Sequence, residues 1–191
     1  MAGTSGAGKS TLIERLVERL GNANSLRLDD YEDSSIYPPV AEWLEGGADP
    51  NRFQSPRFMA DALALKQGEP IIHPVTGEVV QPASYLLLEE PFGRARDAMR
   101  GLIDFLIYID LPLEIAHARK LLRKNDFLPW EDHPERFMQN LRQHLVWYMD
   151  FGRDFYLAVK SSACKDCDLL LDGTLSTEQM ADKIIEAIHP E

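Results

Sequence analysis

Short continuous apolar runs along the chain predict buried β-strands. Two such runs cover residues 85–88 and 105–109; residues 168–171 are predicted as the last strand and residues 25–28 as a short strand. Continuous rather than alternating hydrophobicity is typical of parallel strands, because helices cover both of their faces. We therefore expect these segments to form a mostly parallel sheet.

Between the runs, apolar residues recur at the three- and four-residue spacing of an amphipathic helix. The first helix is predicted over residues 9–20 and stops at Gly21. The last begins at Ser176, which is spaced to form a capping box with Gln179. Further helices are predicted over residues 56–66, 94–102, 112–124 and 134–160. Strands that alternate with helices predict an α/β fold with helices on both faces of the sheet.

Residues 31–56 interrupt this alternation and are rich in Ser, Pro and Gly. We expect a functional loop here rather than a disordered segment, because aromatic residues such as Trp43 and Phe53 are costly to leave in water. A β-hairpin is predicted next, with its turn at residues 74–77.

A glycine-rich segment before the first helix has the spacing G-x-x-x-x-G-K-[ST], the pattern of a phosphate-binding loop. Its residues are Gly3, Thr4, Ser5, Gly6, Ala7, Gly8, Lys9 and Ser10. Glycines let backbone N–H groups approach an anion, and the following helix directs the positive end of its dipole at the same anion. Lys9 would reach the outer phosphates, Ser10 would ligate Mg²⁺ and Thr11 would bind the inner phosphates. The pattern predicts a nucleotide triphosphate site.

Such a loop normally follows a buried strand, yet only Met1 and Ala2 precede Gly3. Either the start of the sequence is truncated or mis-assigned, or the chain has lost most of its central strand. Such a loss would open a gap in the sheet beside the active site, with a cost to stability and activity.

Composition and charge narrow the functional classes. The 191 residues predict one domain, and the formal net charge of −11 argues against non-specific nucleic-acid binding, which needs a basic face. No apolar run approaches the roughly 18 residues of a membrane span, and no secretory signal pattern is present. Cys164 and Cys167 form a lone C-x-x-C without further ligands at zinc spacing, so we expect a reduced, cytoplasmic setting. The oligomeric state stays open.

Phosphoryl transfer needs metal ligands, a base for the attacking hydroxyl and cations for the developing charge. Glu89 ends a buried strand and could hold Mg²⁺ directly or through water. Asp29 ends another strand and could accept the hydroxyl proton, with Asp30 beside it for a sugar hydroxyl. Arg119 and Arg123 share one face of a helix and could close over the phosphates. The alternatives are a solvated strand-end carboxylate, a helix cap and a solvated basic helix.

These landmarks resemble the uridine kinase family, which includes the nicotinamide riboside kinases and is related to pantothenate kinase and phosphoribulokinase. In chain order they read Gly-Thr-Ser-Gly-Ala-Gly-Lys-Ser-Thr, Leu-Asp-Asp-Tyr, Leu-Leu-Leu-Glu and Arg-Lys-x-x-Arg. The resemblance runs over essentially the whole chain. It implies a three-layer P-loop NTPase fold, ATP and Mg²⁺ as cofactors, Asp29 as the catalytic carboxylate, Glu89 near magnesium, and Arg119 and Arg123 as lid cations.

The resemblance also implies how the chain is divided. Residues 1–191 would form one P-loop kinase domain, with a substrate-side insertion at 31–83 and a lid at 119–133. The closing run Leu-Leu-Asp-Gly-Thr is particularly similar to the nicotinamide riboside kinases, and its residues would lie beside adenine. The residues assigned to adenine are Asp172, Gly173 and Thr174, and those assigned to the acceptor are Asp30, Tyr31 and His73.

Three departures limit the resemblance. The hairpin at residues 73–77 lacks the Pro-x-Tyr-Asp segment of uridine kinases, and the lid after Arg123 lacks their further arginines. Glu90 stands where the family usually has glycine. The resemblance therefore implies the phosphoryl-transfer machinery but not pyrimidine recognition.

The sequence thus predicts an ATP- and Mg²⁺-dependent kinase that phosphorylates a hydroxyl of a small molecule, first of all the 5′-hydroxyl of a nucleoside. Nicotinamide riboside, a sugar or another vitamin-like alcohol are the alternative acceptors. An ATPase or nucleotide switch without an acceptor is a second class, although the Asn-Lys-x-Asp motif of guanine-specific switches is absent from the sequence. A non-catalytic binding protein descended from a kinase is a third.

Overall fold

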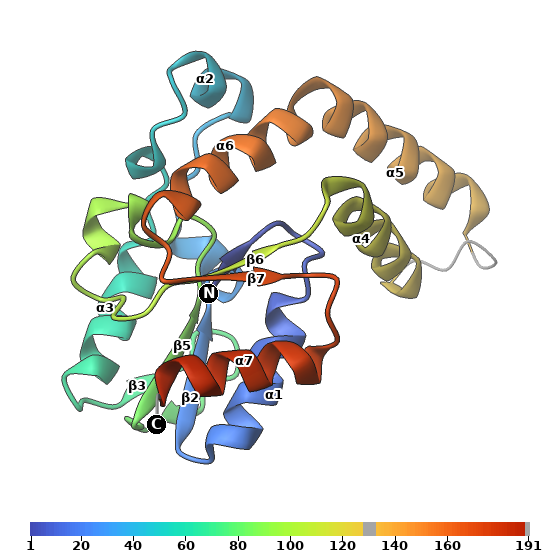
Figure 1. Cartoon of the computed structure of the whole chain (residues 1–191). Coiled ribbons are helices and arrows are strands. Elements are labelled where there is room, and N and C mark those ends of the chain that lie inside the picture. The colour runs from blue at the N-terminus through green and yellow to red at the C-terminus, as the bar shows by residue number, and fades with distance from the viewer. Residues whose placement is uncertain (128–132, 190–191) are drawn as a thin grey trace.

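Parallel strands form the centre of the protein, as the continuous apolar runs predict. The computed structural model describes residues 1–127 and 133–189. β6 pairs with both β1 and β7, β2 pairs with β5, and all of these pairs are parallel (Figure 1). The strands are β1 (Ala2–Gly3), β2 (Ala23–Arg27), β5 (Tyr85–Glu89), β6 (Ile107–Asp110) and β7 (Leu169–Asp172). The predicted α/β fold with a mostly parallel sheet is confirmed.

Helices pack on both faces of the sheet and cross its carboxyl edge (Figure 1). They are α1 (Lys9–Leu20), α2 (Val40–Glu45), α3 (Pro56–Lys66), α4 (Leu113–Phe127), α5 (Pro134–Trp147), α6 (Arg153–Ala163) and α7 (Thr177–Ile188). α5 and α6 form one long arm that passes over the sheet and α4 (Figure 1). Within the described residues, no helix has both the length and the apolar character needed to cross a bilayer.

Successive residues of β6 point into different cores, because side chains alternate across a strand. Tyr108 packs in a cluster with Phe58 of α3. Ile107 and Ile109 pack in a second cluster with Leu16 of α1 and with residues of α7. Both faces of β6 are therefore covered by helices, which explains the absence of polar alternation in this strand.

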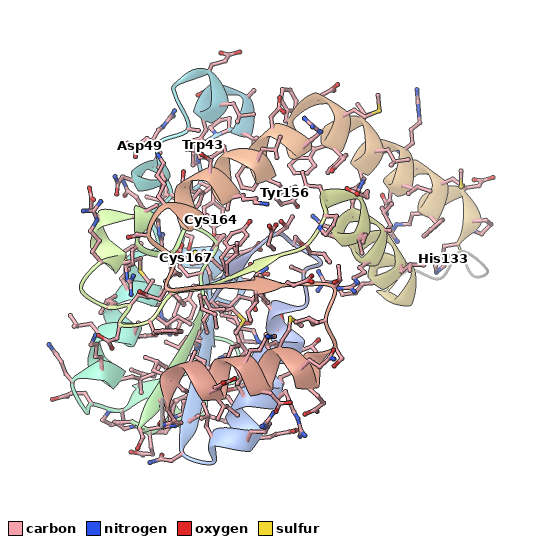
Figure 2. All side chains as sticks on the ribbon, viewed as in Figure 1. Trp43, Asp49, His133, Tyr156, Cys164 and Cys167 are labelled. Carbon is pink, nitrogen blue, oxygen red and sulfur yellow. The ribbon has the colours of Figure 1, made fainter. Side chains whose placement is uncertain are left out.

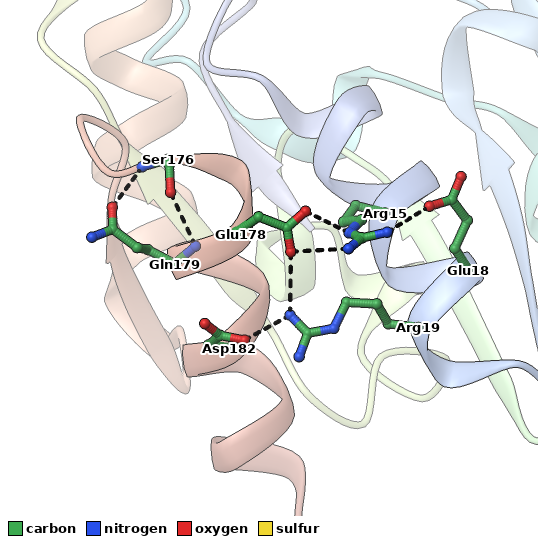
Figure 3. Close-up of polar contacts among 7 residues, drawn as sticks. All are labelled: Arg15, Glu18, Arg19, Ser176, Glu178, Gln179 and Asp182. Carbon is green, nitrogen blue, oxygen red and sulfur yellow. Dashed lines mark hydrogen bonds and ion pairs between the residues drawn. The ribbon is translucent and has the colours of Figure 1, made fainter.

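Charged residues also join α1 to α7 at the surface (Figure 3). Arg15 Nε lies 2.7 Å from Glu178 Oε1, and Arg19 NH1 lies 2.7 Å from Asp182 Oδ1. Exposed pairs of this kind contribute little to stability, because water screens the charges and the side chains lose freedom. The apolar residues buried between the two helices therefore contribute most of the packing energy, and the ion pairs fix the alignment.

β1 is only two residues long, so the sheet has the predicted gap. Met1 bridges to β5 at one end, since its amino group donates to the Leu88 carbonyl at 2.6 Å and its carbonyl accepts from Glu90 N at 3.1 Å. Beyond Met1, no described strand joins β5 to β6. A cavity of about 290 Å³ lies there, lined by β5, Ile107 and Ile184 among others. Its lining residues differ from those around the phosphate loop, so the gap opens behind the loop rather than into the site.

The segment at residues 31–56 is more ordered than the predicted loop. A 3-10 helix at Leu28–Ser34 leads into it, and it contains α2 and a 3-10 turn at Pro50–Arg52. Trp43 of α2 is fully buried, as expected for an aromatic residue in a structured segment. The predicted hairpin is confirmed as an antiparallel pair, β3 (Ile71–Ile72) and β4 (Val79–Val80).

The helix predicted over residues 94–102 is wrong, because the chain forms two 3-10 turns there. Arg96 separates them with extended backbone angles and points inward, leaving only 2% of the residue exposed. Its Nε lies 3.0 Å from Glu90 Oε1, and its NH1 donates to the Phe53 carbonyl at 3.0 Å. The buried ion pair overrides the helical spacing of the sequence.

The helix predicted over residues 134–160 is interrupted between α5 and α6 by a five-residue π-helical turn at Tyr148–Gly152. A Cβ at Gly152 would collide with the Trp147 ring, so the glycine and the wider turn together make room for this side chain. The capping box of α7 is confirmed, with Gln179 N donating to Ser176 Oγ at 3.2 Å and Ser176 N donating to Gln179 Oε1 at 3.0 Å (Figure 3).

Candidate functional site

The predicted phosphate loop joins β1 to α1 at the carboxyl edge of the sheet. α1 starts at Lys9, directly after Gly8, whose φ of 91° lies in the left-handed region that favours glycine. A helix start preceded by such a turn exposes free N–H groups toward one point, where the helix dipole also attracts an anion. The local geometry is therefore that of a phosphate cradle.

Gly6 brings the loop into contact with the start of α4. Its φ is also 91°, and an added Cβ would collide with the Ala116 carbonyl oxygen and come within 3.0 Å of the carbonyl carbon. Only glycine combines this backbone angle with this close approach. The loop and α4 thus meet backbone to backbone, which the glycine spacing alone could not reveal.

Lys9 and Ser10 both contact Glu89 at the end of β5. Ser10 Oγ donates to Glu89 Oε2 at 2.9 Å, and Lys9 Nζ lies 3.4 Å from Glu89 Oε1. Lys9 Nζ also donates to the Thr4 carbonyl at 3.3 Å. These contacts hold the lysine and the hydroxyl at the mouth of the loop, where the sequence predicts them to act.

The Ser10–Glu89 pair fits a magnesium ion. Neighbouring ligands of an octahedral Mg²⁺ with bonds of 2.0–2.1 Å are about 2.9 Å apart, and the two side-chain oxygens have this spacing. A hydroxyl and a carboxylate are a donor set that agrees with Mg²⁺, which is commonly held by one or two carboxylates together with substrate phosphates.

One cavity of about 380 Å³ brings the phosphate loop together with the other predicted catalytic side chains. Asp29, from the 3-10 helix after β2, and Glu89 line it on the strand side. Arg119 and Arg123 of α4 line it as well. Residues from the loop in its lining are Gly3, Ser5, Gly6, Gly8, Lys9, Ser10 and Thr11. Carboxylates and cations from four separate segments therefore surround one space next to the phosphate cradle.

The loop residues Thr4 and Ala7 do not line this cavity, since both side chains are buried. The predicted lid at residues 119–133 begins in α4, and its residues 128–132 lie outside the described residues.

The predicted acceptor residues divide into two groups. His73 Nε2 lies 3.6 Å from Asp30 Oδ2, so the hairpin meets the segment after β2. Tyr31 is 1% exposed, and its hydroxyl donates to Asp61 Oδ2 at 3.0 Å. None of the three lines the cavity around the phosphate loop. Asp30 and His73 contact each other, whereas Tyr31 packs in the core. Substrate binding by Tyr31 stays a prediction, and the burial of the Tyr31 side chain argues against it.

The predicted adenine segment forms a tight turn at the carboxyl end of β7. Asp172 Oδ1 accepts from Thr174 N at 2.9 Å and from Thr174 Oγ1 at 2.6 Å, and these bonds lower the pKa of the Asp172 carboxyl. A Cβ at Gly173 would approach Leu111 Cβ to 2.8 Å, so packing on β6 requires the glycine. The turn does not line the cavity around the loop.

Sequence reasoning missed the contribution of α6. Phe155, Tyr156 and Val159 line the same cavity as the phosphate loop. Figure 2 shows Tyr156 in the region enclosed by α6, α4 and the end of the sheet. The sequence shows these residues as part of an aromatic-rich helix, and only the crossing of α6 over the sheet brings them to the loop.

Comparisons with known proteins give distant sequence relatives. The chain is 28% identical over 141 residues to a uridine kinase of Leuconostoc citreum, covering 66% of this chain and 67% of that protein. It is 25% identical over 202 residues to a uridine kinase of Deinococcus deserti, covering 99% and 93%. It is 30% identical over 151 residues to the chloroplastic phosphoribulokinase of Arabidopsis thaliana, covering 64% of this chain but only 38% of that protein. No protein-family model matches the chain.

Two solved structures share the fold. One, named as a fructose transport system kinase from Silicibacter sp. TM1040, has a TM-score of 0.53 at 18% identity and covers 88% of this chain and 86% of that one. The other, named as a uridine kinase from Bacillus stearothermophilus, has a TM-score of 0.50 at 16% identity and covers 90% and 85%. The sequence relatives and the phosphate loop agree with this fold, and the chain is similar to the uridine kinase-like P-loop kinases.

Proposed function

We propose that the protein is an ATP- and Mg²⁺-dependent kinase that transfers the γ-phosphoryl group to a hydroxyl of a small molecule. The observation that carries the proposal is the shared cavity: the phosphate loop, a base candidate and two arginines face the same space. Such a set matches what phosphoryl transfer needs, which is mostly positioning and charge stabilisation. The relatives named uridine kinase and phosphoribulokinase support the reaction class.

In this proposal the loop amides and Lys9 bind the β- and γ-phosphates. Asp29 orients the acceptor hydroxyl and takes its proton as the oxygen attacks the γ-phosphorus. The bond from that phosphorus to the β-phosphate oxygen breaks, and ADP leaves. Arg119 and Arg123 stabilise the negative charge on the transferring group, and arginines in this role can contribute on the order of 10³-fold or more in rate.

Ser10 and Glu89 would hold Mg²⁺ at the mouth of the loop, in keeping with their 2.9 Å spacing. When bound, the ion would supply positive charge next to the outer phosphates. Lys9 and Ser10 contact different oxygens of the Glu89 carboxylate, Lys9 at Oε1 and Ser10 at Oε2. Glu89 can thus orient Lys9 and serve the metal with separate oxygens.

We propose a nucleoside as the acceptor, bound by the substrate-side segment at 31–83 with Asp30 and His73 facing it. The 3.6 Å approach of His73 to Asp30 supports this placement, because it gives a donor and an acceptor next to Asp29. The names of the relatives support a nucleoside over other alcohols. Nicotinamide riboside, a sugar and other vitamin-like alcohols are the rival acceptors.

The free thiols Cys164 and Cys167 are in keeping with the cytoplasmic setting that we propose.

The experiment that tests the proposal measures ADP formation from ATP with and without a panel of nucleosides, nicotinamide riboside and sugars. We expect one acceptor class to stimulate ADP formation and to yield a phosphorylated product. Equally fast ADP formation without an acceptor would favour an ATPase instead. ATP binding without ADP formation for any acceptor would favour a non-catalytic binding protein.

A further inference from the structure

Lys120 is a cation of α4 that the proposed mechanism does not use. Arg119 and Arg123 line the cavity around the phosphate loop, but Lys120 does not. Its ammonium group instead lies 5.8 Å from the ring centres of both Trp147 and Tyr156. Aromatic faces attract a cation, and more strongly when water is excluded. The rings of α5 and α6 therefore hold this side chain between α4 and the arm of α5 and α6.

Among the residues that the structure describes, no direct ion pair neutralises the charge of Lys120. Within the described residues, no carboxylate lies within 4.0 Å of its ammonium group. Burial lowers the pKa of Lys120, repulsion by Arg123 lowers it further, and attraction by Asp29 opposes both. A partly buried cation without a carboxylate is costly to keep, but its field is also less screened by water.

Tyr156 links this cation to the cavity around the phosphate loop. Its hydroxyl accepts a hydrogen bond from Lys120 Nζ at 3.1 Å. Tyr156 also lines that cavity together with Ser5. One tyrosine of α6 thus joins a residue of α4 to the space beside the loop.

α4 is then held beside the phosphate loop at two points. The first is the backbone contact between Gly6 and Ala116. The second is the hydrogen bond from Lys120 to Tyr156, about one helical turn further along α4. Two contacts fix both the distance and the tilt of a helix, whereas one contact fixes only the distance.

We propose that Tyr156 is a positioning residue that holds α4 beside the phosphate loop through Lys120, so that Arg119, Lys120 and Arg123 present a fixed positive field to the nucleotide. The proposal rests on the proposed kinase function for its effect on turnover. Its effect on nucleotide binding does not depend on that function. Tyr156 therefore has a role at the phosphate site that the loop pattern does not include.

The test is a double-mutant cycle with Tyr156→Phe, Lys120→Met and the double variant. Tyr156→Phe keeps the ring and removes only the hydroxyl. We expect each single variant to weaken ATP binding, measured by calorimetry, by about tenfold, as for the loss of a hydrogen bond to a charged group. We expect the double variant to bind no more than about twofold worse than either single one, because the two residues act through each other.

Tyr148→Phe is the matched control, since the Tyr148 ring stacks on His117 of α4 at 3.8 Å but does not line the cavity around the loop. It should bind ATP like the unchanged protein. Additive losses in the double variant, or an equal loss in Tyr148→Phe, would overturn the proposal. A wild-type protein that binds ATP and forms no ADP would contradict the kinase function alone, and the cycle would still be read from binding.

Discussion

A methyl group at Gly6 tests the contact between the phosphate loop and α4. Alanine in a left-handed conformation costs roughly 1–2 kcal/mol, and φ at Gly6 is 91°. The methyl group also collides with the Ala116 carbonyl, and forcing extra volume into a packed site adds about 1–3 kcal/mol. Gly6→Ala should therefore lower the free energy of unfolding by about 2–5 kcal/mol. A protein of this size should then melt at least about 4 °C lower.

Thermal unfolding followed by circular dichroism measures this loss, and calorimetry measures ATP binding at a temperature where the variant is folded. We expect ATP binding to weaken by at least about tenfold, because the loop or α4 must move aside and the loop amides lose their alignment. Gly101→Ala is the control, since a Cβ there meets nothing within 4 Å, and it should shift stability by less than about 0.5 kcal/mol. An unchanged melting temperature would refute the close contact. Lower stability with unchanged ATP binding would refute the role of the loop.

Three further predictions concern the scaffold. Glu90→Leu alone or Arg96→Met alone should lower the free energy of unfolding in urea by about 3–5 kcal/mol, because each change leaves the other buried charge without its partner. The double variant should lose clearly less stability. Additive losses would contradict this. Burial raises the pKa of Asp168, but a salt bridge from Arg94 and a hydrogen bond from Leu106 N lower it overall. The stabilisation that the ionised Asp168 gives is therefore present above the usual carboxyl pKa and is lost as pH falls below it. Asp168→Asn should lose less stability than wild type between pH 6 and pH 3, and an unchanged loss would contradict this role of Asp168. Four apolar residues added before Met1 should fill the cavity of about 290 Å³ beside β5 and raise the melting temperature. Four added Gly and Ser residues should leave the melting temperature unchanged. Equal melting temperatures for the two variants would show that the cavity does not accept a strand.

The phosphate site is the part that sequence predicts best, because its chemistry depends on neighbouring residues. Lys9, Ser10 and the glycines are fixed by one local pattern, and the helix that follows is strongly amphipathic. Glu89 and Asp29 follow buried runs, and strand ends of a parallel sheet meet at one edge. These residues can be brought together from topology alone, without any long-range contact being known.

The contacts that depend on tertiary packing are not predictable in this way. The inward turn of Arg96 toward Glu90 breaks a segment with helical spacing, because a buried ion pair outweighs local preference. The π-helical turn depends on the Trp147 ring lying over Gly152. Tyr156 reaches the loop only because α6 crosses the sheet, and an aromatic residue in an amphipathic helix carries no signal of that crossing.

The acceptor-dependent turnover of Asp29→Asn tests the central claim most directly. Initial rates of ADP formation are measured with the acceptor that stimulates the unchanged protein, and ATP binding is measured in parallel. The asparagine keeps the size of the side chain and cannot take the hydroxyl proton. We predict that turnover falls by about 10²–10⁴-fold while the ATP dissociation constant stays within about twofold. Unchanged turnover, or turnover and ATP binding that are lost together, would contradict Asp29 as the base of a hydroxyl kinase.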